Sequence, residues 1–119
     1  MRISVLGVEY EITKRKYDED PFFAEKSYDG YCSEYGKKIV YCDMHTFPGC
    51  GNENDEAVIA CEKATLRHEI VHAFLNESGL SYSVGGIDGP WPKCEEVVDW
   101  FAIQGPKIYA AWQAAGAVS

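Results

Sequence analysis

The sequence predicts a single α+β domain in which a small N-terminal sheet packs on helices from the second half of the chain. Apolar and polar residues alternate through residues 2–13, which is the pattern of a strand. Residues 53–78 instead form a long run with helical spacing, and a second helical run begins near residue 92. The 119 residues suffice for one hydrophobic core but not for separate catalytic and binding domains. We therefore expect residues 1–119 to form one domain.

The predicted sheet is built from two hairpins. In the first, the alternation changes phase at residues 6–7, which indicates a bulge or tight turn. In the second, residues 29–42 contain a short strand, a turn near residues 35–36 and a β-rich strand. A short helix over residues 21–26 can separate the hairpins, since proline suits a first helical turn. Residues 38–42 are the candidate for a sheet edge that pairs with an extended substrate; the alternative is a central strand.

The first long helix is expected to begin at residue 53 or 55 and to end at residue 78. Asn52 or Asn54 can cap its start, and Gly79 supplies the left-handed residue that ends it. Its apolar residues, including Cys61 and Phe74, are expected to be mostly buried.

A loop rich in glycine and proline, residues 81–92, follows the first long helix and leads into a second helix over residues 92–104. Gly105-Pro106 is expected to interrupt that helix. A separate apolar helix over residues 107–115 should then pack through Ile108, Tyr109 and Trp112.

The first long helix carries the motif His68-Glu69-Ile70-Val71-His72. With 3.6 residues per turn, His68 and His72 lie on one face, where both imidazoles can bind one Zn²⁺. Glu69 is not spaced to be a third ligand, but it can take a proton from a water held by the metal, the general-base role in a metallohydrolase. The alternative is an ordinary amphipathic helix with two surface histidines, which predicts no third ligand.

A third ligand is available on the second helix, in Glu95-Glu96-Val97-Val98-Asp99. Glu95 and Asp99 are four residues apart and lie on the same side as the apolar stripe of Val98, Phe101 and Ala102, so Glu95 is expected to bind the metal and Asp99 to hold a histidine. Glu96 points about 100° away and is the alternative ligand. The loop over residues 43–54 contains His45 and Cys50, but three ligands are found elsewhere and we expect no metal there.

Composition argues against several other classes of protein. The net charge is −8 and the 11 basic residues are scattered, so nucleic acid is not an expected direct ligand. The five cysteines form no Cys-x-x-Cys pair, and we expect reduced thiols. The N-terminus does not read as a signal peptide, and no apolar run approaches the roughly 20 residues of a membrane span, so we expect a cytoplasmic protein.

With both motifs placed, the chain resembles the gluzincins, zinc peptidases whose His-Glu-x-x-His is followed by a ligand Glu in a Glu-x-x-x-Asp pattern. More narrowly, residues 65–80 and 94–108 are similar to small phage and prophage-encoded metallopeptidases related in pattern to the ImmA/IrrE and SprT-like groups. The resemblance implies a minimal zincin-like fold, with a small N-terminal sheet on the active-site helix, then a ligand-bearing helix and a C-terminal helix.

The expected function is peptide-bond hydrolysis by a zinc-bound water, with Zn²⁺ held by His68, His72 and Glu95. Glu69 would be the general base, and the substrate would be a protein or peptide. Tyr82, Tyr109 and His45 are candidates for stabilising the oxyanion, from their chemistry alone. The alternative is a non-catalytic, zinc-stabilised protein-interaction module, which would have no use for Glu69 as a base. The sequence predicts no oligomeric state.

Overall fold

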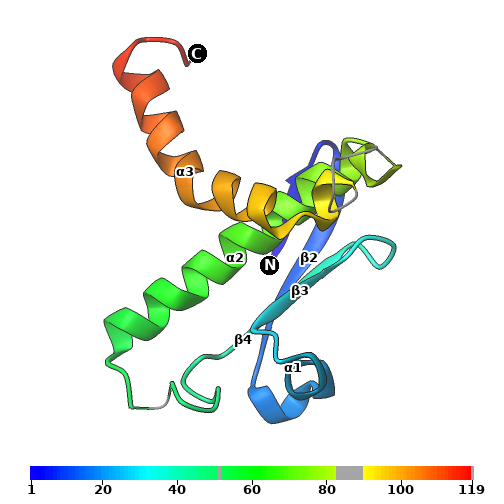
Figure 1. Ribbon diagram of the computed structural model, residues 1–119, viewed down its shortest axis with the longest axis vertical. Coiled ribbons are helices and arrows are strands. Elements are labelled where there is room, and N and C mark those ends of the chain that lie inside the picture. Colours follow the sequence, from blue (N-terminus) through cyan, green and yellow to red (C-terminus); the bar gives the residue numbers. More distant parts are fainter. Residues whose placement is uncertain (51, 83–89, 119) are drawn as a thin grey trace.

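The computed structural model, which describes residues 1–50, 52–82 and 90–118, has the α+β architecture expected from the sequence (Figure 1). Four strands form one sheet in the order β1-β2-β4-β3. Their bounds are β1 (Arg2–Val5), β2 (Val8–Arg15), β3 (Gly30–Ser33) and β4 (Lys38–Cys42). The helices are α1 (Pro21–Lys26), α2 (Asp55–Glu77) and α3 (Glu95–Ala114), with short 3-10 turns η1 (Tyr17–Glu19), η2 (Leu80–Tyr82) and η3 (Trp91–Lys93).

Both predicted hairpins are present. β1 pairs antiparallel with β2, and Leu6 and Gly7 between them have φ of 50° and 83°. Two consecutive positive φ values are typical of the tight hairpin turn whose twist matches that of the strands. β3 pairs antiparallel with β4, and β4 pairs in parallel with β2 to join the hairpins into one sheet.

The prediction that residues 38–42 form a substrate-binding edge is wrong, because β4 lies between β2 and β3. Its run of apolar residues suits this position, since Ile39 and Val40 are both fully buried, one on each face. The edge strand on this side of the sheet is β3.

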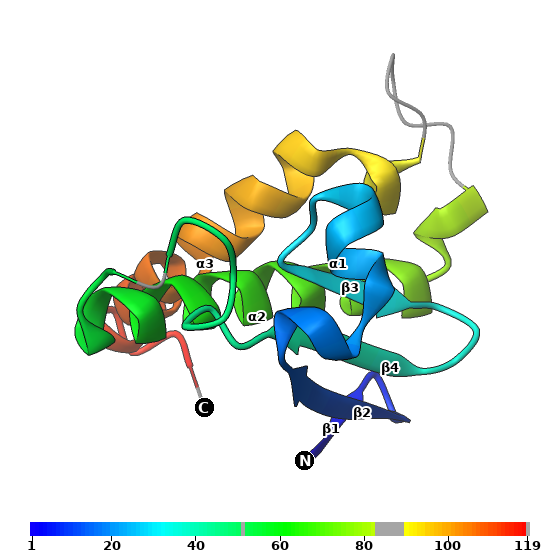
Figure 2. The same ribbon diagram turned by 90° about the horizontal axis from the view of Figure 1, so that it is seen from below.

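Adjacent side chains of β4 belong to two different core clusters. Ile39 packs in the same cluster as Ala73 of α2, whereas Val40 packs in the cluster that contains Phe23 of α1 and Val58 near the start of α2. Alternation along a strand explains this division. In Figure 2, the first half of α3 and strand β1 lie on opposite sides of α2.

Helix α2 begins where expected, because the side chain of Asn54 accepts a hydrogen bond from the backbone N–H of Ala57. Its buried residues, however, are Val58, Glu62, Thr65, Glu69 and Ala73. Cys61 and Phe74 are exposed, so the expectation that they belong to the core is wrong. Leu66 and Ile70 of α2 are partly buried against the sheet, beside fully covered small and acidic residues, so the sheet covers only one narrow face of the helix.

Helix α3 is continuous from Glu95 to Ala114, so the predicted break at Gly105-Pro106 and the separate C-terminal helix are wrong. Pro106 lacks the N–H that would bond the carbonyl of Ala102, and proline inside a helix bends it instead of ending it where the rest of the ladder is kept. Figure 1 shows α3 changing direction partway along. Beyond the bend, the predicted packing of Tyr109 and Trp112 is also wrong, since these side chains are exposed.

The five cysteines, all in the described part of the chain, are free thiols, as expected. Among the described helices, none combines the length and the apolar character that crossing a bilayer requires. The glycine-rich loop expected over residues 81–92 falls largely on residues 83–89, which lie outside the described residues.

Candidate metal centre

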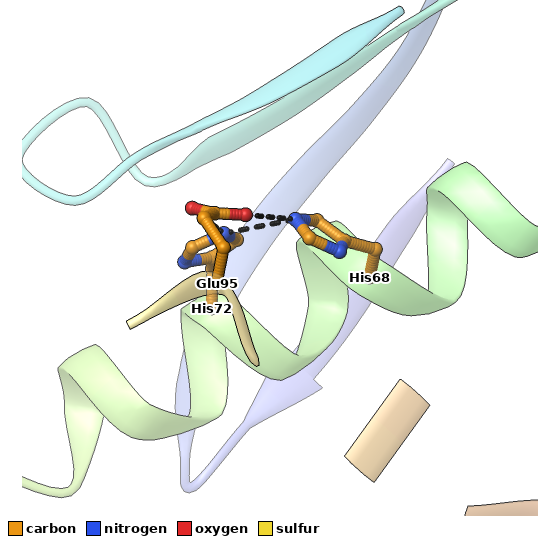
Figure 3. A group of neighbouring side chains, drawn as sticks. All are labelled: His68, His72 and Glu95. Atoms are coloured by element: carbon orange, nitrogen blue, oxygen red, sulfur yellow. Dashed lines mark hydrogen bonds and ion pairs between the residues drawn. The ribbon is translucent and has the colours of Figure 1, made fainter. Parts of the chain in front are cut away.

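The two motif histidines and Glu95 meet between α2 and the first turn of α3 (Figure 3). The Nε2 atoms of His68 and His72 lie 3.1 Å apart. The carboxylate of Glu95 approaches both, at 3.0 Å from Nε2 of His68 and 3.3 Å from Nε2 of His72. The structure therefore brings together the three side chains expected from the sequence, with their donor atoms facing one point.

The other ring nitrogens of the histidines are held by hydrogen bonds. Nδ1–H of His68 donates to Oδ1 of Asp99 at 2.6 Å, and Nδ1–H of His72 donates to the backbone oxygen of Pro92 at 2.7 Å. With hydrogens on both Nδ1 atoms, the neutral imidazoles present lone pairs on their Nε2 atoms. Two such lone pairs 3.1 Å apart beside a carboxylate repel one another unless a proton or a metal ion lies between them.

Burial keeps this site suited to a metal. Burial lowers the pKa of His72, and the neighbouring His68 lowers it further, although the carboxylate of Glu95 opposes the shift. A neutral imidazole is the form that binds a metal. The donor set of two imidazoles and one carboxylate is typical of catalytic zinc sites, which keep a fourth position open.

Glu69 lies beside the cluster but outside it. Its Oε1 is 4.0 Å from Nε2 of His68, and the residue is buried. Burial raises the pKa of Glu69 to about 7; His68 lowers it and the carboxylates of Glu95 and Asp29 raise it. A carboxylate whose pKa is near neutral can both accept a proton and return it, as a general base must.

Glu96 is not in the cluster. It is exposed on α3, whereas its neighbour Glu95 contacts both imidazoles. Successive helical residues point about 100° apart, so only one of the two glutamates faces α2. The geometry favours Glu95 as the third ligand, with Asp99 as the residue that orients His68.

A groove of about 700 Å³ surrounds the cluster. Its floor is α2, one wall is β3 with residues of α1 and the adjoining turn, and the other wall is α3. The end beyond Ala64 is lined by the side chains of Phe22, Tyr28 and Ile103, and the opposite end is lined by Asn76. The groove therefore has large apolar side chains at one end, with the charged Arg67 between them and the cluster along α2, and a polar side chain at the other end.

Three residues that position β3 against the groove were missed by the sequence analysis. Oγ1 of Thr65 donates a hydrogen bond to Oδ2 of Asp29 at 2.9 Å, which ties the start of β3 to α2. A Cβ atom on Gly30 would lie only 2.8 Å from Cγ2 of Thr65. A glycine inside a predicted strand is itself a signal of such close approach.

A second group of possible ligands consists of Asp43, His45 and Glu62. Glu62 already pairs with Nζ of Lys14 at 2.9 Å and accepts a hydrogen bond from the backbone N–H of Met44. The ammonium group of Lys14 thus already supplies the positive charge beside Glu62. Unlike the cluster of His68, His72 and Glu95, this group does not present free donor atoms that face one point. His45 instead pairs with Asp43 and with Asp55 of α2.

Of the three oxyanion candidates, the two whose side chains the structure describes do not line the groove. His45 lies near the start of α2, and Tyr109 lies beyond the bend of α3, both away from the groove lining. Tyr82 belongs to η2, and its side chain lies outside the described part of the structure.

Comparisons of this chain with protein-family models, with curated proteins and with solved structures found no match. The resemblance to gluzincins stays a prediction, and function is inferred from the site.

Proposed function

We propose that this protein is a zinc-dependent metallopeptidase, with His68, His72 and Glu95 as the metal ligands. The observation that carries the proposal is the convergence of two imidazole Nε2 atoms and one carboxylate on one point, with both Nδ1 atoms held by other partners. Zinc at this point would make water a nucleophile near neutral pH and polarise the substrate carbonyl.

Glu69 is proposed as the general base. Its carboxylate is close to the histidines without joining the ligand cluster, and its raised pKa of about 7 suits proton transfer near neutral pH. It takes the proton from the attacking water and later delivers this proton to the leaving nitrogen. A purely structural zinc site has no use for such a base, which favours an enzyme over an interaction module.

Strand β3 is proposed to bind the substrate backbone. The N–H of Cys42 donates to the backbone oxygen of Asp29, so these two residues form a hydrogen-bonded pair of the antiparallel ladder. Such pairs alternate with non-bonded pairs, so the backbone groups of Gly30 and Cys32 face away from β4. Both residues line the groove, where an extended peptide can add to the sheet.

The two ends of the groove suggest a preference among peptides. A peptide paired with β3 would extend toward Phe22, Tyr28 and Ile103 at one end. These side chains form a surface for a bulky apolar residue near the cleaved bond, because burying such a residue there is favourable. The opposite end, at Asn76, offers a polar surface.

The proposal is tested by zinc content and by peptide cleavage, measured on protein purified without a histidine tag. We expect about one zinc per chain, lost in His68→Ala. Glu69→Gln should keep zinc and lose hydrolysis, since the amide has nearly the same size but cannot accept the proton. Wild-type protein that binds no zinc in titration would rule out the proposal, whereas zinc without cleavage of any peptide in a library would favour the interaction module.

A matched pair of variants tests the third ligand. Glu95→Gln should weaken zinc binding severely, whereas Glu96→Gln, an identical change at the next residue of the same helix, should leave it unchanged. A loss of affinity confined to the Glu96 variant would reverse the assignment.

A further inference from the structure

Helix α3 carries an exposed apolar surface that the proposed metal site does not use. We name the α3 surface by its exposed members Trp100, Phe101, Tyr109 and Trp112, together with the half-buried Ile108. The exposed fractions of the two tryptophans are 54% and 55%, and those of Phe101 and Tyr109 are 40% and 49%. None of these residues lines the groove. Large side chains of this kind are more often sheltered from water in a folded protein.

The fold itself leaves this surface uncovered. The buried residues of α3, Val98 and Ala102, both precede Pro106. Beyond the bend, the second half of the helix points away from α2 and from the sheet (Figure 1). Short helices are only marginally stable in water by themselves. The second half of α3, which leaves the body of the protein, would therefore be stabilised by packing against another protein surface.

The charge pattern restricts what can cover the surface. From Trp100 to the end of the sequence the only charged residue is Lys107, although the chain as a whole is 25% charged and carries a net charge of −8. Along the second half of α3, beyond Asp99 and Trp100, a basic partner would find no carboxylate, and an acidic partner would find one lysine. The α3 surface therefore fits an apolar partner.

We infer that the α3 surface pairs with the same surface of a second copy of this chain. Two copies with a net charge of −8 repel each other unless acidic residues stay out of their contact, and the last acidic residue of the chain is Asp99. The second half of α3 meets this condition. A two-fold dimer uses the same patch on both subunits, which suits a surface that is apolar and almost uncharged.

The available area corresponds to a weak dimer, which forms only at high protein concentration. An aromatic side chain buries about 150–250 Å², so the four aromatic residues, roughly half exposed, offer on the order of 400 Å². This is about half of the ~800 Å² that each partner contributes to a standard interface. Ile108 and the exposed alanines at positions 110, 111 and 114 extend the surface along the helix.

Sedimentation velocity of the full chain between about 1 and 200 µM tests this inference. Wild-type protein should be dimeric at the upper concentrations, and raising the salt should not dissociate it, because salt screens the repulsion between acidic subunits. Trp112→Glu and Tyr109→Glu should each weaken the dimer about tenfold or more. Ile59→Glu is the matched control, since it puts the same charge at a 46%-exposed apolar position on α2 and should leave the dimer intact.

Circular dichroism and zinc titration of each variant check that the fold and the metal site are kept, so that loss of the dimer is not loss of structure. A wild-type protein that stays monomeric throughout, or a dimer that survives both substitutions in α3, would overturn the inference. So would a monomer that binds phosphatidylcholine vesicles through Trp112, because the surface would then face lipid. None of these results depends on peptidase activity.

Discussion

Replacing Gly30 with alanine tests how closely β3 must approach α2. The new Cβ would lie 2.8 Å from Cγ2 of Thr65 and 3.1 Å from the backbone oxygen of Val40. Carbon atoms pack best at about 3.5–4.0 Å, so the first contact is about 0.7–1.2 Å too short. Because Val40 belongs to the sheet, the strand cannot relieve the clash by moving toward β4.

Two effects of Gly30→Ala follow from this geometry. Forcing one carbon atom into a packed region costs about 1–3 kcal/mol of unfolding free energy. Moving the strand away from α2 displaces Gly30 relative to Glu69, whose Cγ would be 3.5 Å from the new atom. A displacement on the order of 1 Å at a substrate-binding position can lower kcat/KM about 100-fold.

Urea unfolding, zinc titration and peptide cleavage measure these effects separately. Zinc affinity should be unchanged, because the proposed ligands lie on α2 and α3. Thr65→Ser removes Cγ2 but keeps the hydroxyl that bonds Asp29, so the double variant should recover part of the lost stability.

A Gly30→Ala variant that unfolds at the same urea concentration as wild type would show that the new Cβ meets no clash. A variant that loses stability of which Thr65→Ser recovers none would contradict the predicted contact. In that case the contact with Thr65 would not be the cause, and the glycine would be needed for another reason.

Two further predictions concern hydrogen-bonded carboxylates. Asp99→Asn should lower zinc affinity about 10- to 100-fold, because an amide orients the imidazole of His68 less well than the carboxylate, whose Oδ1 lies 2.6 Å from Nδ1 of His68. A zinc titration that gives the same affinity for the variant and the wild type would contradict this role. Burial raises the pKa of Asp20, but hydrogen bonds from Tyr31, the N–H of Phe22 and Arg15 outweigh burial and lower it below 3.8. A carboxylate with a lowered pKa contributes stability that is present above about pH 4 and is lost as the pH falls. Asp20→Asn should therefore lower the free energy of unfolding by about 1–3 kcal/mol at pH 7. The difference from wild type, measured by urea unfolding, should shrink progressively at lower pH.

The sequence was sufficient to predict elements whose signals are local. The turn at Leu6 and Gly7, the cap at Asn54 and the short helix after Asp20 follow from the chemistry of a few adjacent residues. The convergence of His68, His72 and Glu95 was also expected, since the spacing of the histidines fixes their common face and the second helix has few acidic residues to offer.

What could not be predicted depends on tertiary position. Whether Lys38–Cys42 is a central or an edge strand depends on the parallel pairing with β2, which no local pattern encodes. Likewise, the apolar character of Tyr109 and Trp112 predicted burial. Burial requires a neighbour, however, and the second half of α3 bends away from α2. The sequence predicted a break at Gly105-Pro106 where the helix only bends. Proline removes one hydrogen bond of the helix, and whether the helix then ends or continues depends on the residues on either side.

The open edge of β3 would be a site of aggregation in many proteins, because exposed backbone groups can pair with any extended chain. Here the strand has four residues, and only Gly30 and Cys32 direct backbone groups outward. A fibril-like stack would gain too few hydrogen bonds from so short an edge, and α3 stands across the groove where a second sheet would have to pack. The segment with the strongest tendency to form β structure, Lys38–Cys42, is enclosed between two strands. The edge at β3 is thus too short to template polymerisation, although a single extended peptide could pair with it.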